Sequence, residues 1–463
     1  MTAIPMSSSS QLLHNVLSGL FDAEKTHLVT VSQAVGIDWV KECINTYPEI
    51  CWLAGEDVRA TQEGKATDQA PYSEQLFGKA YIEFDRTMMT LHCLRLILDG
   101  SETAYQEFTA DQKSNKLSRD GFKELHKLGQ GLLQSKYEGL SKQDMQQAME
   151  TALVLGDLGK SQKAREVFRA WGVKAPDHDD FHGELLAVFQ NHPELCKTYN
   201  KLSAAAQKLL SETANLIHYG HVTHLEGGPN MFAKLQKALK EKQLSGMALL
   251  FDQFVHMCDV AGAAGHVNRS SSLAYTETCH QALGAIRKAF ENSLDSDDFA
   301  VDAYDAYIGI RAEWLGLNIL SSTHRVLTRI GAMLRLCTLE DGSCLKEAFK
   351  KLDQEQQLTV AQQFDSERDH LERTPTYMPA VLLNLYNNQA LGESKAERMD
   401  KTIALGMPFL ARVLERHKQA IAKGEADPSI PLNFNKAAGI AKDSPEKLNN
   451  EFSIESNGDV IVS

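Results

Sequence analysis

The sequence predicts an all-α protein, because apolar residues recur with helical spacing along most of its 463 residues. Alternating, strand-like runs are rare, so sheets contribute little to the predicted fold. In residues 141–155, Ser141 stands where a helix N-cap is expected, and Asp144 supplies the acid of a first helical turn. The apolar face of this predicted helix consists of Met145, Ala148, Met149, Ala152 and Leu153.

The same helical spacing continues through the rest of the chain. The expected helices cover residues 80–99, 120–135, 162–172, 181–190, 201–224, 232–240, 246–264, 273–292, 299–320, 323–337, 345–370, 378–388 and 396–422. One hairpin is expected at the C-terminal end, where residues 452–463 alternate around Asn457-Gly458, a dipeptide typical of a type I′ turn. The predicted architecture is therefore helical with a short terminal hairpin.

Changes in composition divide the chain into four consecutive regions. Residues 424–450 are rich in Pro, Asn and Lys, as expected for a linker or a tail. The four regions are an N-terminal helical region (1–115), a core that holds most of the informatively spaced histidines (116–268), a C-terminal helical region (269–425) and a tail with a hairpin (426–463).

Composition and charge exclude several classes of protein. Hydrophobic residues make up 43% of the chain and charged residues 24%, as in globular proteins. The net charge of −13 would repel a phosphate backbone, so broad nucleic-acid binding is not expected, although a local basic pocket is compatible with it. There is no run of about 18 apolar residues and no signal-peptide pattern, so no membrane partner is expected. The eight cysteines form no CxxC pair and fit a reducing compartment, which predicts a cytoplasmic location.

Histidine and aspartate residues between positions 126 and 259 follow an informative order. His126 lies in an apolar helical stripe, and Asp157 follows within LVLGDLGKSQ (153–162), at the end of a predicted helix. Imidazole and carboxylate groups together are typical ligands of transition-metal ions. Further along the chain come His178 and His182, then His218, His221 and His224, and last Asp252, His256 and Asp259 on one helix face.

This order resembles that of the HD domain, a helical fold of metal-dependent phosphohydrolases and phosphodiesterases. In that family a first His precedes a His-Asp pair with Gly-Lys after it, then further His residues and a closing Asp. His126 is similar to the first His, Asp157 to the Asp of the pair, and Gly159-Lys160 to the dipeptide that follows. The resemblance over residues 116–268 is completed by His178 or His182, by one of His218, His221 and His224, and by Asp259.

The resemblance implies an HD-domain-like helical core with additional N- and C-terminal helices, and hydrolysis of a phosphate ester of a nucleotide or phosphorylated small molecule. Asp157 and Lys160 would act in catalysis, Lys160 by contact with the substrate phosphate. Such a ligand set favours Fe, Mn, Zn or Ni and also admits Mg, and the metal would lower the pKa of a bound water toward about 7. The implied metal ligands are His126, Asp157, His182, His221 and Asp259.

The sequence departs from the family pattern at residue 156, where Gly156 stands in place of the His of the pair. Two alternatives follow. Either His218, His224 or His256 supplies the missing ligand, or the site is inactive and the protein acts in interaction or regulation.

Two local patterns also have structural explanations. GDLGK (156–160) is typical of an ordinary helix end with a glycine cap and a turn aspartate. Residues 152–172 also resemble a single TPR-type helical repeat, but no second copy follows at the expected spacing.

Overall fold

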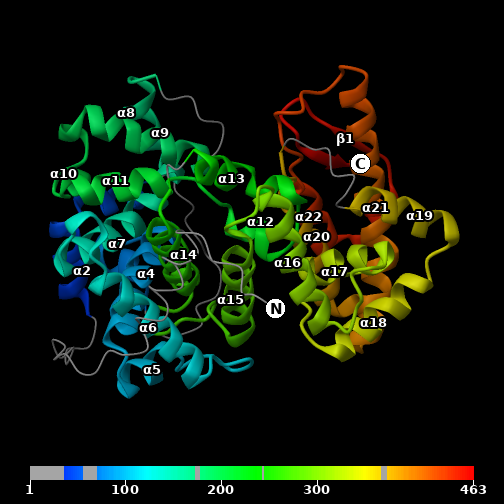
Figure 1. Ribbon diagram of the computed structural model, residues 1–463. Coiled ribbons are helices and arrows are strands. Elements are labelled where there is room, and N and C mark those ends of the chain that lie inside the picture. The colour runs from blue at the N-terminus through cyan, green and yellow to red at the C-terminus, as the bar shows by residue number, and fades with distance from the viewer. Residues whose placement is uncertain (1–35, 56–69, 173–177, 242–243, 366–372) are drawn as a thin grey trace, which may run out of the picture. The chain divides into compact units, whose positions relative to one another are not determined.

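The structure of the protein, a computed structural model, describes residues 36–55, 70–172, 178–241, 244–365 and 373–463 (Figure 1). Helices make up nearly all of its regular structure, and the strands in these ranges form one two-stranded sheet near the C-terminal end. The predicted all-α class with a terminal hairpin is therefore confirmed. Within the same ranges, no helix has the length and apolar character that crossing a bilayer requires.

The chain divides into two compact units. Unit 1 comprises Met1–Leu216 and Ala238–Leu283, and unit 2 comprises Ile217–Lys237 and Gly284–Ser463. The boundaries predicted after residues 115, 268 and 425 all fall inside one of these units. The reason is packing between helices that are distant in sequence, which changes in composition along the chain do not reveal.

Unit 1 is built from α-helices joined by short 3₁₀ turns. Two further helices, α13 (Ala233–Lys240) and α15 (Glu277–Ser293), contain boundaries between the units. The helices of unit 1 are α2 (Ile37–Thr46), α3 (Tyr72–Phe77), α4 (Ile82–Asp99), α5 (Glu102–Phe108), α6 (Arg119–Gln134), α7 (Lys142–Gly156), α8 (Gln162–Arg169), α9 (His178–Asn191), α10 (Lys197–Asn200), α11 (Ala204–Thr213) and α14 (Gly246–Gly262). Its 3₁₀ helices are η1 (Pro48–Ala54), η2 (Tyr137–Gly139), η3 (Leu158–Lys160) and η4 (Pro193–Leu195).

Helix α4 is the central helix of unit 1. It is buried on almost every side, and α5, α6, α7 and α14 pack against it. Helix α14 approaches it closely, since a Cβ on Gly262 would lie 2.4 Å from the backbone nitrogen of Thr90. A Cβ on Gly265 would lie equally close, 2.4 Å, to the backbone oxygen of Asp85. The C-terminal end of α14 therefore lies against the N-terminal half of α4.

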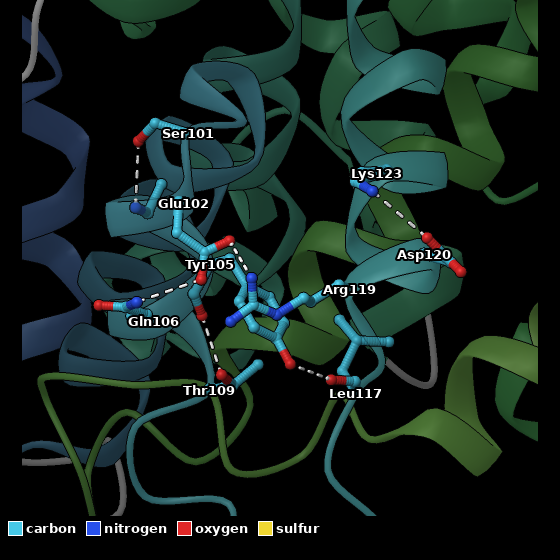
Figure 2. A network of polar contacts seen from close by, with 10 residues as sticks. Ser101, Glu102, Tyr105, Gln106, Thr109, Leu117, Arg119, Asp120 and Lys123 are labelled. Atoms are coloured by element: carbon cyan, nitrogen blue, oxygen red, sulfur yellow. Dashed lines mark hydrogen bonds and ion pairs between the residues drawn. The ribbon is translucent and has the colours of Figure 1, made fainter.

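A polar network fixes α5 to the start of α6 (Figure 2). Arg119 forms an ion pair with Glu102 at 2.7 Å, and its guanidinium lies 5.3 Å from the centre of the Tyr105 ring. The Tyr105 hydroxyl donates a hydrogen bond to the carbonyl oxygen of Leu117 at 3.0 Å. These contacts orient α6, the helix that carries His126.

Helix α7 begins and ends close to the predicted positions. The Ser141 hydroxyl accepts a hydrogen bond from the Asp144 backbone nitrogen at 3.1 Å, and the Asp144 carboxylate accepts one from the Ser141 backbone nitrogen at 3.0 Å. This reciprocal capping box confirms the predicted N-cap. The helix ends at Gly156, one residue beyond the predicted end.

Unit 2 has its own hydrophobic core, formed around the long helix α21. Helices α18, α19 and α20 pack against α21. The elements of unit 2 are α12 (Tyr219–Thr223), η5 (Pro229–Phe232), α16 (Phe299–Trp314), α17 (Ser322–Met333), α18 (Leu339–Lys350), α19 (Gln354–Phe364), α20 (Met378–Asn387), η7 (Gln389–Leu391), α21 (Lys395–Ala422), α22 (Asn435–Asp443), η8 (Pro445–Asn449), β1 (Phe452–Ile454) and β2 (Val460–Val462).

The C-terminal hairpin forms where it is predicted, but with a different turn. Strands β1 and β2 pair antiparallel, with Ile454 opposite Val460. Gly458 has a positive φ of 86°, whereas Asn457 does not, so the type I′ turn predicted from this dipeptide is wrong. The chain turns instead through a hydrogen bond from the Gly458 nitrogen to the Glu455 oxygen at 2.9 Å.

Candidate functional site

The segment after α7 is the 3₁₀ turn η3, which carries two charged side chains, Asp157 at its start and Lys160 at its end. Asp157 is the C-cap of α7, and the Lys160 nitrogen donates a hydrogen bond to its carbonyl oxygen at 3.0 Å. Two side chains hold the turn from outside. The Ser161 hydroxyl donates to the Trp52 oxygen at 2.9 Å, and Arg165 Nε donates to the Gly159 oxygen at 2.7 Å. The backbone around Asp157 and Lys160 is thus held in place by its own contacts.

Five charged side chains, Glu83, Arg86, Asp157, Lys160 and Asp259, form a charge cluster in unit 1. Lys160 Nζ lies 2.7 Å from Asp157 Oδ1 and 2.9 Å from Glu83 Oε2. Arg86 NH1 lies 3.0 Å from the same Glu83 oxygen. The side chains of Glu83, Asp157, Lys160 and Arg86 are 8%, 15%, 22% and 23% exposed, so the cluster is sheltered but reaches the surface.

Asp259, on α14, belongs to the cluster through electrostatic interactions. Burial raises the pKa of Asp259 to about 6 and repulsion from Asp157 adds to the rise, while Arg86 and Lys160 oppose it. Burial lowers the pKa of Arg86, but attraction to Asp157, Glu83 and Asp259 outweighs burial and raises it. When all three carboxylates are ionised, the cluster has one more negative charge than positive charges.

The face of α4 that carries Glu83 and Arg86 also holds two polar groups that are not satisfied. Arg86 Nε is buried and finds no hydrogen-bond partner among the described residues. Thr87, four positions after Glu83 and so on the same helix face, is 2% exposed, and its hydroxyl has no partner in the described part of the chain either. Buried donors without acceptors are costly, and in a native protein each calls for an explanation, such as a bound water, an ion or a catalytic role.

The structure brings together three of the residues that the sequence places in one site. All three lie in the charge cluster. Asp157 immediately precedes η3, Lys160 is the last residue of η3, and Asp259 is on α14. His182 is half-buried on α9, a helix that packs against η3. The side chain of the alternative residue, His178, lies outside the described side chains.

His126 lies away from the charge cluster, at the other end of α4. Its Nδ1 is 2.9 Å from the carbonyl oxygen of Ile97, in the last turn of that helix. The positive φ of Gly100, 67°, ends α4 there, and a Cβ on this residue would lie 2.2 Å from His126 Nδ1. Glu83 lies in the first turn of α4, about 20 Å away along the helix axis at 1.5 Å per residue. The prediction that His126 shares a metal with Asp157 is therefore corrected: its ring caps a helix.

His221 belongs to unit 2, where it helps to order a short helix. Its Nδ1 pairs with Glu226, and its backbone nitrogen donates to His218 Nδ1 at 3.2 Å. The rings of His218 and His221 lie against each other at a tilt of 40°, with their centres 3.8 Å apart. Burial lowers the pKa of His224 to about 3, and Arg335 adds to this effect, so His224 is neutral near pH 7. Within unit 2 these three histidines make local contacts that stabilise the α12 segment.

The donor set decides which metal the charge cluster fits. Among the described residues, no three His, Cys, Asp or Glu side chains converge as the ligands of a metal ion. The mixed His/Asp set predicted for a transition metal is therefore not assembled there. What the cluster offers is carboxylate oxygen, and a Mg²⁺ or Mn²⁺ ion can be held by one or two carboxylates together with substrate phosphate and water. The donors that the cluster offers to such a hard cation are two carboxylates, those of Asp157 and Glu83, which both contact the Lys160 ammonium.

Sequence reasoning missed Glu83 and Arg86. Both lie on α4, far upstream of the pattern that begins at His126. One signal for them exists in the sequence: IEFDRTMMTLHCLRLILD (82–99) is apolar on most sides, yet it carries three charges near its start. Charges on a helix buried all round need partners, so they indicate a polar site in the core.

Comparison with known proteins gives a family and no function. No curated protein and no solved structure matches the chain. A family model matches residues 53–431, a span that contains all five residues of the charge cluster. The chain belongs to this family, which is described as a family of unknown function (DUF6829).

Proposed function

We propose that the protein is a metal-dependent hydrolase of a phosphate ester, a nucleotide or a phosphorylated small molecule, and that the charge cluster of unit 1 is its site. One observation carries the proposal. Asp157, Lys160 and Asp259, which the HD-domain resemblance assigns to one site, lie in one partly exposed cluster although α14 is far from η3 in sequence. The proposed ligand set differs from that of the resemblance, because it contains carboxylates and no imidazole.

The carboxylates of Asp157 and Glu83, which share the Lys160 ammonium, would hold a divalent cation such as Mg²⁺ or Mn²⁺, and Asp259 would add negative charge nearby. Their negative charge exceeds that of the two neighbouring cations, which favours a further positive ion over a free anion. When bound, the ion would supply a water of lowered pKa and neutralise charge on the phosphoryl oxygens.

Arg86 and Lys160 would bind the phosphate. The unused Nε–H of Arg86 can donate to a phosphate oxygen, and a guanidinium suits the planar geometry of that contact. The side chain of Lys160 is 22% exposed and ends in a compact charge on a flexible stem, so it can turn toward a substrate. The Thr87 hydroxyl, on the same face of α4, is a further unused donor.

A second candidate is a protein without catalytic activity that acts in interaction or regulation. It is favoured by Lys160 Nζ, which already lies within 3 Å of two carboxylate oxygens, 2.7 Å from Asp157 and 2.9 Å from Glu83. In this case the cluster is an ion-pair network that holds η3 to α4, and Gly156 marks the loss of a metal ligand.

Phosphate-ester turnover in the presence of Mg²⁺ or Mn²⁺ distinguishes the two candidates. A screen would cover phosphomonoesters, phosphodiesters and nucleotides, with D157N and D259N as test variants. Asp120 is 90% exposed and outside the cluster, so D120N is the matched control. We expect turnover that falls at least about 100-fold in D157N and D259N and is unchanged in D120N. No turnover of any compound, or equal turnover in all three variants, would favour the second candidate.

We propose a cytoplasmic location on the basis of the thiols. All eight cysteines lie in described parts of the chain and none is in a disulfide. Cysteines that form no disulfide although some are half-exposed are typical of a reducing compartment.

A further inference from the structure

The Lys160 ammonium occupies the position where the charge cluster would hold a cation. It lies 2.7 Å from Asp157 Oδ1 and 2.9 Å from Glu83 Oε2, so two carboxylates from separate elements share it. A divalent ion bound to the same oxygens would approach them to about 2.0–2.2 Å. The ammonium and the ion cannot use these oxygens together, because two positive charges would then lie within a few ångströms of each other.

We infer that Lys160 is a built-in competitor of the divalent cation, and that the cluster binds a metal–phosphate complex in preference to the free metal ion. The inference rests on the proposed function and names the ligand class of that site. Entry of the ion displaces the Lys160 ammonium from both carboxylates. A sheltered ammonium without a partner is costly, and a phosphate supplies the new partner. Metal and phosphate therefore bind with positive cooperativity.

The surroundings of the cluster fit this exchange. The backbone of Lys160 is fixed by hydrogen bonds that Ser161 and Arg165 donate, so only the side chain needs to move. The unused Arg86 Nε and the buried, unpartnered Thr87 hydroxyl are independent indications of an anion, since both can donate to oxygen. A phosphate at this face of α4 would satisfy both groups and the released ammonium.

The experiment measures Mn²⁺ binding by electron paramagnetic resonance in wild type, K160M and K123M, with and without inorganic phosphate. Lys123 is a matched control, because it also follows an aspartate by three residues, at 3.4 Å from Asp120, but is 66% exposed and outside the cluster. In wild type and K123M we expect phosphate to tighten Mn²⁺ binding about tenfold. In K160M we expect tighter binding of Mn²⁺ alone and an effect of phosphate below about twofold.

Equal Mn²⁺ affinity in K160M and wild type, or an equal effect of phosphate in both, would overturn the inference. Since K160M removes the cation that Asp157 and Glu83 share, thermal melting is measured with each sample, and the double variant E83Q/K160M removes an acid together with the ammonium. If K160M does not fold, E83Q/K160M must lose the phosphate effect, and retention of that effect overturns the inference. If Mn²⁺ and phosphate bind cooperatively but no phosphate ester is hydrolysed, the inference stands and the hydrolase proposal is wrong. If phosphate esters are hydrolysed but Mn²⁺ and phosphate bind independently, the hydrolase proposal stands and the inference is wrong.

The hydroxyl on the same face of α4 gives a second, smaller test. T87V keeps the shape of the side chain and removes the donor. We expect it to leave binding of Mn²⁺ alone unchanged and to reduce the effect of phosphate. An undiminished effect of phosphate in T87V would contradict an anion at this face of the helix.

Discussion

The two ends of α4 place polar groups against neighbouring segments in different ways. At the C-terminal end, His126 Nδ1 and Gln130 Nε2 each meet one main-chain carbonyl, those of Ile97 and Leu98, at 2.9 and 2.8 Å. At the N-terminal end, three carboxylates meet two cations, and a buried donor on Arg86 has no acceptor in the described part of the chain.

This difference separates a structural role from a capacity to bind. Where each side-chain nitrogen meets one main-chain carbonyl, as around Gly100, the contacts stabilise a helix end and leave no unused donor or acceptor for a ligand. Groups with unequal charge and unused donors can still gain interactions, provided that they reach solvent. Asp157 and Lys160, 15% and 22% exposed, meet that condition. The following predictions test this comparison, in order of decreasing effect on stability.

The N-terminal end of α4 is expected to make stability depend on pH. Burial raises the pKa of Asp85 to about 6, although hydrogen bonds from Ser73 oppose the rise. The folded state therefore binds a proton more tightly than the unfolded state, so stability falls as pH rises from about 4 to about 6 and is level above. Between these pH values the free energy of unfolding of D85N should fall by about 2 kcal/mol less than that of wild type. A smaller fall should remain in D85N, because the pKa of Asp259 is also raised. Urea unfolding at a series of pH values measures this, and parallel curves for the two proteins would contradict it.

The C-terminal end of α4 is expected to contribute stability alone. H126A removes the cap on the Ile97 carbonyl and should lower the free energy of unfolding by about 1 kcal/mol. Mn²⁺ binding and phosphate-ester turnover should match wild type, because the ring lies at the far end of the helix from the charge cluster. Loss of Mn²⁺ binding in folded H126A would break the comparison and restore His126 as a metal ligand.

Restoring the imidazole that the sequence lacks should have the smallest effect on stability. A Cβ on Gly156 would meet no described atom within 4 Å, and φ there is ordinary for a helix, so G156H should change the free energy of unfolding by less than about 0.5 kcal/mol. Beside Asp157, the new ring should tighten Ni²⁺ binding about tenfold, measured by calorimetry. Unchanged Ni²⁺ affinity would show that the surroundings of Asp157 are not those of an HD-type site.

Local features of the fold could be predicted from the sequence because they depend on neighbouring residues. The capping box of Ser141 and Asp144 and the end of α7 follow from spacing within one turn of helix. The turn type at Asn457-Gly458 could not be predicted in this way. Pairing of β1 with β2 and the bond from Gly458 to Glu455 set the backbone there, and they override the preference of the dipeptide.

The candidate site was predictable only in part. Asp157 and Lys160 share a turn, so their proximity follows from the local sequence. Asp259 was assigned to the same site only because of the resemblance to the HD domain. His126 fitted the same pattern but caps α4, because a ring nitrogen suits a helix-end carbonyl as well as it suits a metal. His221 lies in unit 2, and spacing along the chain carries no information about the unit to which a residue belongs.

By itself the sequence determined the all-α class, most helix positions and the turn that carries Asp157 and Lys160, because periodicity, caps and short turns are local properties. Only the tertiary structure decided which charges meet. Close packing of α14 and the turn after it on α4, through Gly262 and Gly265, puts Asp259 beside groups from the start of α4. The same holds for Glu83 and Arg86. Buried charges need partners, and the packing of helices that are distant in sequence determines which residues those partners are.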